Sequence, residues 1–215
     1  MESASISPFP SSSTRQAQRE AKREALLVAA VRMFNERGFH ATSLDDVAAS
    51  LGVTKPVVYH YLGNKDQVLF ECVRIGLVRL REAADRARER PGTGLDRLKV
   101  FLRGYAEANM SDFSRCVIRT ADEALSPESA AQFRALKAEI DSAMRAMIAE
   151  AAADGSARVS DVWLTAFTFA GALNWPARWY RDDGARSAAT IAEEMVELLV
   201  SGIAPAPGSG RGDVR

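Results

Sequence analysis

Helix-capping residues recur along almost the whole chain, and they restrict its fold more than any other feature of the sequence. About nine segments carry apolar residues at helical spacing and are bounded by Ser, Thr or Asn caps or by glycine. No segment alternates apolar and polar residues over the length of a β-strand. The sequence therefore predicts an all-α fold, with helices over about 15–37, 42–52, 54–62, 64–89, 95–109, 113–125, 127–155, 161–180 and 187–200.

The two ends of the chain differ in composition from its helical part. Residues 1–14 are rich in Ser and Pro, and residues 204–215 read "APAPGSGRGDVR". Such segments bury too little apolar surface to fold, so both are expected to be disordered tails. Between them we expect two helical domains, over residues 15–66 and 67–203.

The charge balance and the cysteines exclude several classes of protein. The 28 basic residues equal the 28 acidic residues in number, so only a local patch could attract nucleic acid. Cys72 and Cys116 lie in helical patterns and are expected to be buried thiols, and no Cys/His spacing predicts a metal site or cofactor. The N-terminus lacks signal-peptide features and no segment is long enough to span a membrane, so we expect a cytoplasmic protein without a membrane partner.

The window "SLGVTKPVVYHYLGNKDQVL" at residues 50–69 places two short helices on either side of "LGVT". This arrangement is typical of a helix-turn-helix, whose second helix enters the major groove of DNA. Apolar residues can hold the two helices against the first helix of the chain, namely Leu44, Val47, Ala48, Leu51, Val53 and Val58. The residues left for the outer surface are Thr54, Lys55, Pro56, Tyr59, His60 and Tyr61.

The chemistry of these outer residues fits a DNA surface. Lys55 can reach a guanine edge or a phosphate, and the tyrosine hydroxyls can donate to phosphates. Lys65, together with free amides at the start of the following helix, predicts an anion site. Thr42 and Ser43 offer hydroxyls and amides to the other side of the groove, where "TSLD" has the shape of a capping box that starts at Thr42.

Structural roles for several of these residues remain open. Thr42 and Thr54 would also serve simply as helix caps, and His60 would also suit an ordinary surface position. Three consecutive helical residues span most of a helix circumference, so Tyr61 could pack partly inward.

The run "LLVAAVRMFNERGFHATSLDDVAASLGVTKPVVYHYLGNKDQVL" resembles the N-terminal domain of the TetR (tetracycline repressor) family of transcription regulators. The resemblance covers about residues 20–70, and it departs at Leu62, where the family pattern has phenylalanine. It implies that Thr42 and Ser43 start a phosphate-contacting helix and that Lys65 clamps the DNA backbone. It also implies that the recognition surface consists of Thr54, Lys55, Pro56, Tyr59, His60 and Tyr61.

The segment from Val162 to Trp175 has no charge and no polar face. A helix that is apolar all round must be buried all round, and Gly171 with its neighbouring alanines would allow close approach of a partner helix. We expect a homodimer through the last two long helices, over about 160–202, as the family resemblance also implies. The alternative is a central helix in a monomeric bundle.

The segment "NWPARWYRDDG" at 174–184 is similar to the C-terminal domains of TetR-type regulators of fatty-acid, steroid or aromatic-acid catabolism, several of which respond to acyl-CoA. Pro176 is expected to kink the helix that contains it. An acyl-CoA needs an apolar slot and arginines for its phosphates. Core packing, surface ion pairs and dimer contacts are the alternative roles for the expected effector residues, which are Phe101, Tyr105, Arg115, Arg119, Trp175, Arg178, Trp179 and Arg181.

The sequence argues against an enzyme. His40 and His60 are the two histidines, and the chain has neither a Glu-x-x-His motif nor a Gly-rich phosphate loop or nucleophile elbow. We therefore expect a homodimeric, ligand-responsive repressor that leaves a palindromic operator when an apolar effector binds, an acyl-CoA or related catabolic acid being one expected class. An activator of the same fold is one alternative. A helical protein-interaction dimer is another, and it leaves the aromatic residues at 59–61 unexplained.

Overall fold

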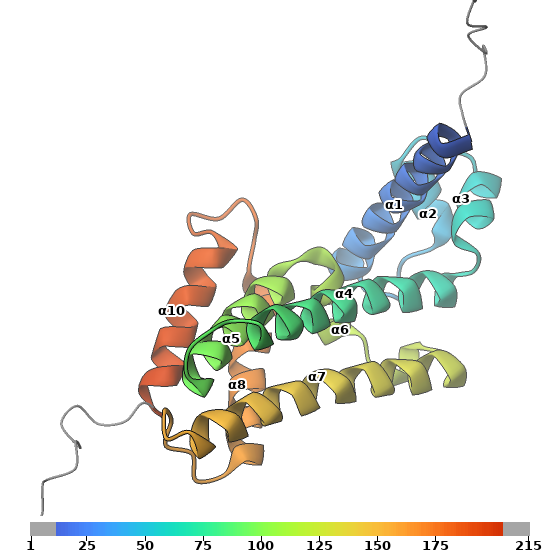
Figure 1. Cartoon of the computed structure of the whole chain (residues 1–215). Coiled ribbons are helices and arrows are strands. Elements are labelled where there is room, and N and C mark those ends of the chain that lie inside the picture. Colours follow the sequence, from blue (N-terminus) through green and yellow to red (C-terminus); the bar gives the residue numbers. More distant parts are fainter. Residues whose placement is uncertain (1–11, 204–215) are drawn as a thin grey trace, which may run out of the picture.

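The computed structural model describes residues 12–203, which form ten α-helices and one 3-10 helix without a strand (Figure 1). This architecture confirms the all-α prediction. Of the two expected tails, residues 1–11 and 204–215 lie outside the described part, whereas residues 12–14 form the first turn of α1. The elements are α1 Ser12–Arg37, α2 Leu44–Ser50, α3 Lys55–Leu62, α4 Lys65–Arg88, α5 Gly94–Met110, α6 Asp112–Arg119, η1 Asp122–Ala124, α7 Pro127–Ala153, α8 Val162–Asn174, α9 Pro176–Trp179 and α10 Ala188–Ser201.

Helices α1, α2 and α3 form a small three-helix unit at one end of the molecule (Figure 1). Val31 of α1, Val47 of α2 and Val58 of α3 are wholly buried, and this shared core holds α3 in place. Leu51 and Val53 are 42% and 36% exposed, so the prediction that they belong to this core is wrong. Gly52, with φ of 64°, turns the chain between α2 and α3. The side chains of its neighbours, Leu51 and Val53, lie on the outside of this turn.

Helix α4 runs from the three-helix unit into the second unit, where it packs against α5, α6 and α7 (Figure 1). Helix α5 lies at the centre of that unit and contacts α4, α7, α8 and α10. The largest fully buried side chains of the second unit come from α5, α7 and α8, and they include Phe101, Leu98, Leu102, Met110, Phe133, Ile148 and Leu173. Helix α4 packs against this core and also contacts α1 and α3. Among residues 12–203, it is the long helix that runs through both units.

Gly76 brings α4 and α6 unusually close together. A Cβ atom at this position would lie 2.8 Å from the carbonyl oxygen of Phe113 and 2.8 Å from Val117 Cγ2. The hydroxyl of Ser114 donates to the Gly76 carbonyl at 3.3 Å, which ties the same two backbones together. The backbones of α4 and α6 are therefore in direct contact at Gly76.

Two helices end earlier than the sequence predicts. Helix α6 stops at Arg119 because Thr120 adopts an extended conformation, and its hydroxyl donates back to the Cys116 carbonyl at 2.7 Å. Pro176 breaks the helix that was expected to continue with a kink: α8 ends at Asn174, and the short α9 begins at Pro176.

Cys72 and Cys116 are buried free thiols, as predicted. Burial raises the pKa of Cys116 to about 11 and that of Cys72 well above its ordinary value, so both are protonated at neutral pH. Within residues 12–203, no helix has the length and apolar character needed to cross a membrane, and no cluster of His, Cys, Asp or Glu could hold a metal ion.

Candidate DNA-binding surface and effector cavity

Helix α3 offers one face to the core and the other to solvent. Val58 and Leu62 are buried, which leaves the rest of the helix on the outside. Tyr59 is 50% exposed, and the other exposed residues of this face are Thr54, Lys55, Pro56, Val57 and His60. The Thr54 side chain makes no capping hydrogen bond, so capping does not occupy its hydroxyl. The arrangement is a rigid helix whose polar and aromatic side chains point away from the protein.

Tyr61 and Lys55 are more constrained than their neighbours. Tyr61 is half-buried against the core and makes an edge-on contact with the His60 ring, at 5.2 Å between centroids. The Lys55 ammonium donates a hydrogen bond to the Asp45 carboxylate of α2, which raises the pKa of Lys55. Tyr61 therefore packs partly inward, and the Lys55 ammonium is held next to Asp45 of α2.

The start of α2 differs from the prediction by one residue. Ser43, not Thr42, is the N-cap: its hydroxyl accepts from the Asp46 amide at 3.1 Å, and Asp46 accepts from the Ser43 amide at 2.8 Å. Thr42 is only 1% exposed, and its hydroxyl donates to the Gly38 carbonyl at 3.0 Å. The prediction that Thr42 contacts DNA is therefore wrong, because its side chain is buried and hydrogen-bonded to the end of α1. Ser43 stays on the surface.

Lys65 lies at the start of α4 but is held by the loop that follows α1. Its ammonium is 3.4 Å from the His40 carbonyl oxygen and 4.3 Å from the centre of the Phe39 ring. Asn64 and Gln67 form a capping box that satisfies both of their backbone amides. These two amides are not available to an anion, so the expected site at this helix start is reduced to Lys65 and the remaining free amides.

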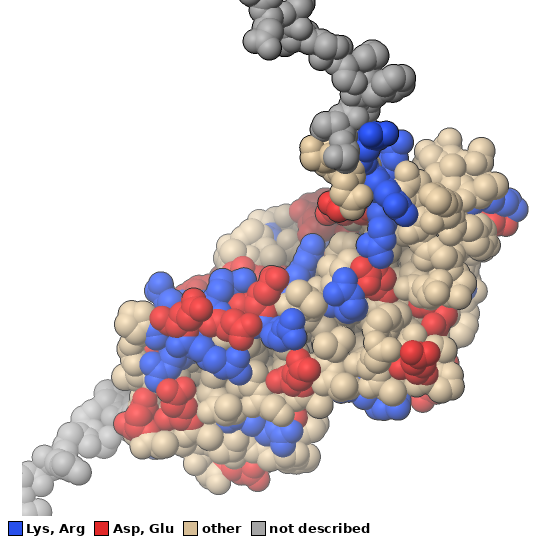
Figure 2. All heavy atoms as spheres, turned by 45° about the vertical axis from the view of Figure 1, so that its right-hand side comes forward, with Lys and Arg blue, Asp and Glu red and all other residues tan. Residues whose placement is uncertain are grey.

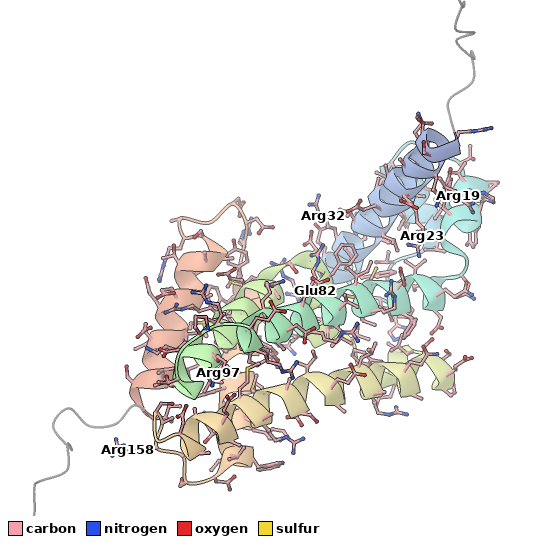
Figure 3. All side chains as sticks on the ribbon, viewed as in Figure 1. Arg19, Arg23, Arg32, Glu82, Arg97 and Arg158 are labelled. Atoms are coloured by element: carbon pink, nitrogen blue, oxygen red, sulfur yellow. The ribbon has the colours of Figure 1, made fainter. Side chains whose placement is uncertain are left out.

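Sequence reasoning missed a basic strip on the N-terminal half of α1. Arg15, Arg19 and Lys22 are exposed, and Figure 2 shows Lys and Arg side chains gathered at this end of the molecule. Arg23 turns toward α4 and pairs with Glu71 at 3.1 Å (Figure 3). The spacing of Arg15, Arg19 and Lys22 by four and three residues, which places them on one helix face, could have revealed the strip from the sequence.

The second unit contains a cavity of about 260 Å³, called here the main cavity. Residues from α4, α5, α6, α7 and α8 surround it, and Thr120 adds the end of α6. Its apolar lining consists of Leu77, Leu80, Val117, Ile118, Ile140, Met144 and Ala170. Its polar lining consists of Tyr105, Asn109, Thr120, Lys137, Asp141 and Asn174.

Three of the polar residues that line the main cavity are joined by hydrogen bonds. The Tyr105 hydroxyl and the Asn109 side-chain amide both donate to Asn174 Oδ1, at 2.8 and 2.9 Å. Burial raises the pKa of Tyr105, so the phenol stays neutral. Lys137 and Asp141 come from α7, where Asp141 is paired with Arg145 and Lys137 lies over the Phe133 ring. The cavity is therefore a small apolar space with one neutral polar end.

Of the residues expected to bind the effector, only Tyr105 lines the main cavity among residues 12–203. Phe101 is wholly buried, and its ring makes an edge-on contact with the Tyr105 ring, with 5.8 Å between the ring centroids. Trp175 and Trp179 are 61% and 47% exposed on the outside of the molecule. Arg115 donates to the Met110 and Tyr180 carbonyls, and Arg181 pairs with Asp183. These positions assign Phe101 to packing and place the two tryptophans outside the cavity.

Arg119 and Arg178 line a second cavity of about 310 Å³, called here the junction cavity, between α1, α6 and α9. Arg119 donates to the Asn35 carbonyl of α1 and, at 3.3 Å, to the Arg178 carbonyl. Burial, followed by the charges of Arg115 and Arg178, lowers the pKa of Arg119. Thr120 lines both cavities, so two of the four expected arginines, Arg119 and Arg178, lie next to the main cavity rather than inside it.

Helix α6 also connects the second unit to α1. The Asn35 side-chain amide donates to the Asp112 carbonyl at 2.8 Å, and Arg32 pairs with the Asp112 carboxylate at 2.9 Å. Figure 3 shows Arg32 where α1 meets the second unit. One face of α6 lines the main cavity through Val117 and Ile118, so this helix touches both the cavity and the DNA-binding unit.

The outer face of α8 exposes an aromatic stripe. Trp163, Phe167, Gly171 and Trp175 follow one another at intervals of four residues. Trp163 and Phe167 are 55% and 54% exposed, and the centroids of their rings are 4.4 Å apart. The neighbouring Leu164 is 57% exposed. An apolar surface of this kind is typical of a protein interface.

A helix-turn-helix with an exposed second helix, joined to a helical unit with a cavity, defines a DNA-binding transcription regulator with a ligand-binding domain. Residues 26–72 match the family described as "Bacterial regulatory proteins, tetR family", and residues 91–203 match "Tetracyclin repressor-like, C-terminal domain". The second match alone covers more than half of the chain. The chain therefore belongs to the TetR family, as its N-terminal sequence predicted.

Individual relatives extend the likeness over nearly the whole chain. The HTH-type transcriptional repressor KstR2 of Mycolicibacterium smegmatis is 28% identical over 193 residues, which cover 87% of this chain and 93% of KstR2. The structure of PfmR from Thermus thermophilus, a TetR family regulator, is 29% identical with a TM-score of 0.74, covering 86% of this chain and 99% of PfmR. AibR, solved in complex with isovaleryl coenzyme A and operator DNA, is 26% identical with a TM-score of 0.72, covering 83% of this chain and 97% of AibR.

Proposed function

We propose that this regulator is a homodimeric repressor that binds a palindromic operator through two α3 helices and leaves it when a small, largely apolar effector binds. The observation that carries the proposal is the position of α6, which lines the main cavity on one side and bonds to α1 on the other. The name of the full-length relative KstR2, a transcriptional repressor, supports the sign of regulation.

The exposed face of α3 would contact the major groove. Lys55, Pro56 and His60 are the proposed contacts to base edges, while Tyr59 and Lys65 would hold the sugar-phosphate backbone. Thr54 and the half-buried Tyr61 would complete this surface, with Ser43 on the opposite side of the groove. The basic strip of α1 adds phosphate contacts that raise affinity without sequence preference.

The aromatic stripe of α8, together with α10, would form the dimer interface over about 160–202. Trp163, Leu164 and Phe167 are exposed in the single chain, and Leu198 of α10 is 76% exposed. A two-fold axis through this surface would bury the same residues on both subunits. Two α3 helices held in this way would enter successive major grooves about 34 Å apart.

An acyl-CoA is the proposed effector class. AibR was solved with isovaleryl coenzyme A, and the two cavities of this chain meet at Thr120. The acyl group would enter the main cavity while Arg119 and Arg178 meet the phosphates of the nucleotide part. A thermal-shift comparison of isovaleryl-CoA, octanoyl-CoA and free coenzyme A tests this class. Stabilisation by free coenzyme A alone, or by none of the three, would exclude it.

DNA selection from a random double-stranded pool tests the function as a whole. The full chain should retain a palindromic sequence, and a reporter gene placed behind that sequence should be silenced by the protein. Retention of no sequence would favour the protein-interaction dimer. Retention with an increase in expression would favour the activator.

We expect Asn35→Ala to weaken the coupling between effector and operator. The substitution removes the amide that donates to Asp112, so α6 can move without pulling α1. Operator affinity without effector should change little. The factor by which the effector lowers the operator affinity should become roughly fivefold smaller. Fluorescence anisotropy with and without effector measures both quantities. Glu36→Ala, at an exposed position of the same helix, is the control, and an unchanged effector response in Asn35→Ala would contradict the proposed route.

A further inference from the structure

The main cavity contains a buried hydrogen-bond acceptor that no group within residues 12–203 satisfies. Asn109 lines the cavity and is 0% exposed. Its amide nitrogen donates to Asn174 Oδ1 at 2.9 Å and lies 3.4 Å from the Leu173 carbonyl oxygen. Both neighbours are acceptors, so they fix the orientation of the amide group. Asn109 Oδ1 accepts no hydrogen bond from the described part of the chain.

Buried acceptors are costly unless a donor reaches them, and nearly all in native proteins have one. Asn109 is an unusual choice for this position, because the neighbouring lining residues Leu77, Leu80 and Met144 are aliphatic. A leucine of similar shape would pack there without leaving a polar atom unpaired. The amide is instead held in place by Asn174, on a helix 65 positions further along the chain. The wall of the cavity therefore includes a residue with a positioned, unpaired acceptor.

The neighbours of Asn109 decide which ligand group it can take. Tyr105 already donates its hydroxyl proton to Asn174 Oδ1, so it has no proton left to give to Asn109 Oδ1. The charged lining residues Lys137 and Asp141 both come from α7, while this end of the cavity is built by α5 and α8. A carboxylate or phosphate at Asn109 Oδ1 would meet acceptor oxygens without a compensating donor. A hydroxyl or N–H group would meet a complementary surface.

The size of the cavity limits the rest of the ligand. A cavity of roughly 150 Å³ lined by apolar residues holds a benzene molecule, so 260 Å³ has room for a ligand of about ten non-hydrogen atoms. The aliphatic lining favours an apolar body. Exposed Lys137 marks a solvent-facing part of the cavity wall, where a longer molecule could continue outward.

We propose that the main cavity selects an apolar molecule that carries a hydroxyl or N–H donor, and that Asn109 Oδ1 is the acceptor that recognises this donor. The inference rests on the proposed function, because it assigns the effector to this cavity, and it narrows the effector class. If the effector is an acyl thioester, an acyl group that carries a hydroxyl or amide should bind more tightly than the plain alkyl groups of isovaleryl-CoA and octanoyl-CoA. Asn174 is the positioning residue that holds both Asn109 and Tyr105.

Three ligands of similar shape test the inference on the DNA-free protein. 4-Propylphenol has a hydroxyl where 4-propyltoluene has a methyl group, and 4-propylanisole keeps the oxygen but cannot donate. Isothermal titration calorimetry with the full chain should give about tenfold or tighter binding of the phenol than of either analogue. Asn109→Leu should remove this preference. Tyr105→Phe, which leaves Asn109 in place, should keep it.

Several results would overturn the inference. Equal affinity for the phenol and the anisole would show that no donor is recognised, and this comparison needs only the unmodified protein. Binding of none of the three compounds at millimolar concentration would exclude the cavity as a donor-selective site. A retained preference in folded Asn109→Leu would place the recognition elsewhere. None of these measurements involves DNA, so failure of the proposed repressor function would be seen separately, as failure to retain a palindromic sequence.

Discussion

Replacing Tyr59 by alanine is expected to weaken operator binding on the order of a hundredfold, since each α3 helix of the proposed dimer loses about 1–2 kcal/mol of contact energy. Tyr59 is half-exposed and makes no side-chain hydrogen bond within residues 12–203 for which the fold would need it. The free energy of unfolding should therefore change by less than about 0.5 kcal/mol. Fluorescence anisotropy on the selected operator measures the affinity, and circular dichroism checks the fold.

Two further variants separate the roles of ring and charge. Tyr59→Phe keeps the ring and removes the hydroxyl, so it should recover the part of the affinity that does not depend on a phosphate hydrogen bond. Lys65→Ala should weaken binding to all DNA sequences alike and reduce the salt dependence, as expected of a phosphate contact. Lys99→Ala, on α5 and paired with Glu197, is the lysine control. Operator binding like that of the unmodified chain in both Tyr59→Ala and Lys65→Ala would exclude this surface as the DNA site.

Phe167→Glu is expected to turn the dimer into a monomer. The substitution places two like charges near the two-fold axis of an apolar interface, where an unpaired buried charge costs several kcal/mol. Dimer affinity should fall by at least about a hundredfold, and operator binding should fall with it, because one subunit reaches only half of a palindrome. Sedimentation velocity measures the association state directly.

Phe167 can be replaced without disturbing the fold of its own subunit, because its side chain is largely exposed in the single chain. At 54% exposure, Phe167 contributes little to the core of its own subunit, so the helical content should be preserved. Ala138→Glu adds the same charge at an exposed position of α7 and should leave the dimer intact. A Phe167→Glu protein that sediments as a dimer would show that the stripe serves another purpose.

The DNA-binding unit was largely predictable because its determinants are local. The cap at Asn64, the turn at Gly52 and the apolar positions of α2 and α3 lie within about 25 residues of sequence, and each acts on its immediate neighbours. The family resemblance rests on the same residues. The DNA contacts themselves stay predictions, since the free chain fixes their exposure and not their partners.

The errors in this unit come from tertiary contacts. Both Thr42 and Ser43 are good caps by composition, and the choice between them depends on the carbonyl groups at the end of α1 that accept the Thr42 hydroxyl. Leu51 and Val53 flank a glycine with positive φ, and the direction of that turn decides whether they face inward. Neither choice is encoded in the spacing of apolar residues.

The effector cavity was much less predictable, because its polar end joins residues distant in the sequence. Asn109 and Asn174 carry no motif, and either would pass for an ordinary polar residue of an amphipathic helix. An acyl-CoA site would be expected to use arginines and aromatic residues, and Phe101, Trp175 and Trp179 fit that expectation by residue type alone. Burial and exposure place these three outside the cavity.

The spacing of the two half-sites tests the central claim most directly. In the proposed repressor, two α3 helices, held by one dimer, enter successive major grooves on the same face of DNA. Anisotropy should therefore show tight binding to the selected palindrome, and at least about a hundredfold weaker binding when five base pairs, half a helical turn, are inserted between the half-sites. Equal affinity for both DNA molecules would contradict the account.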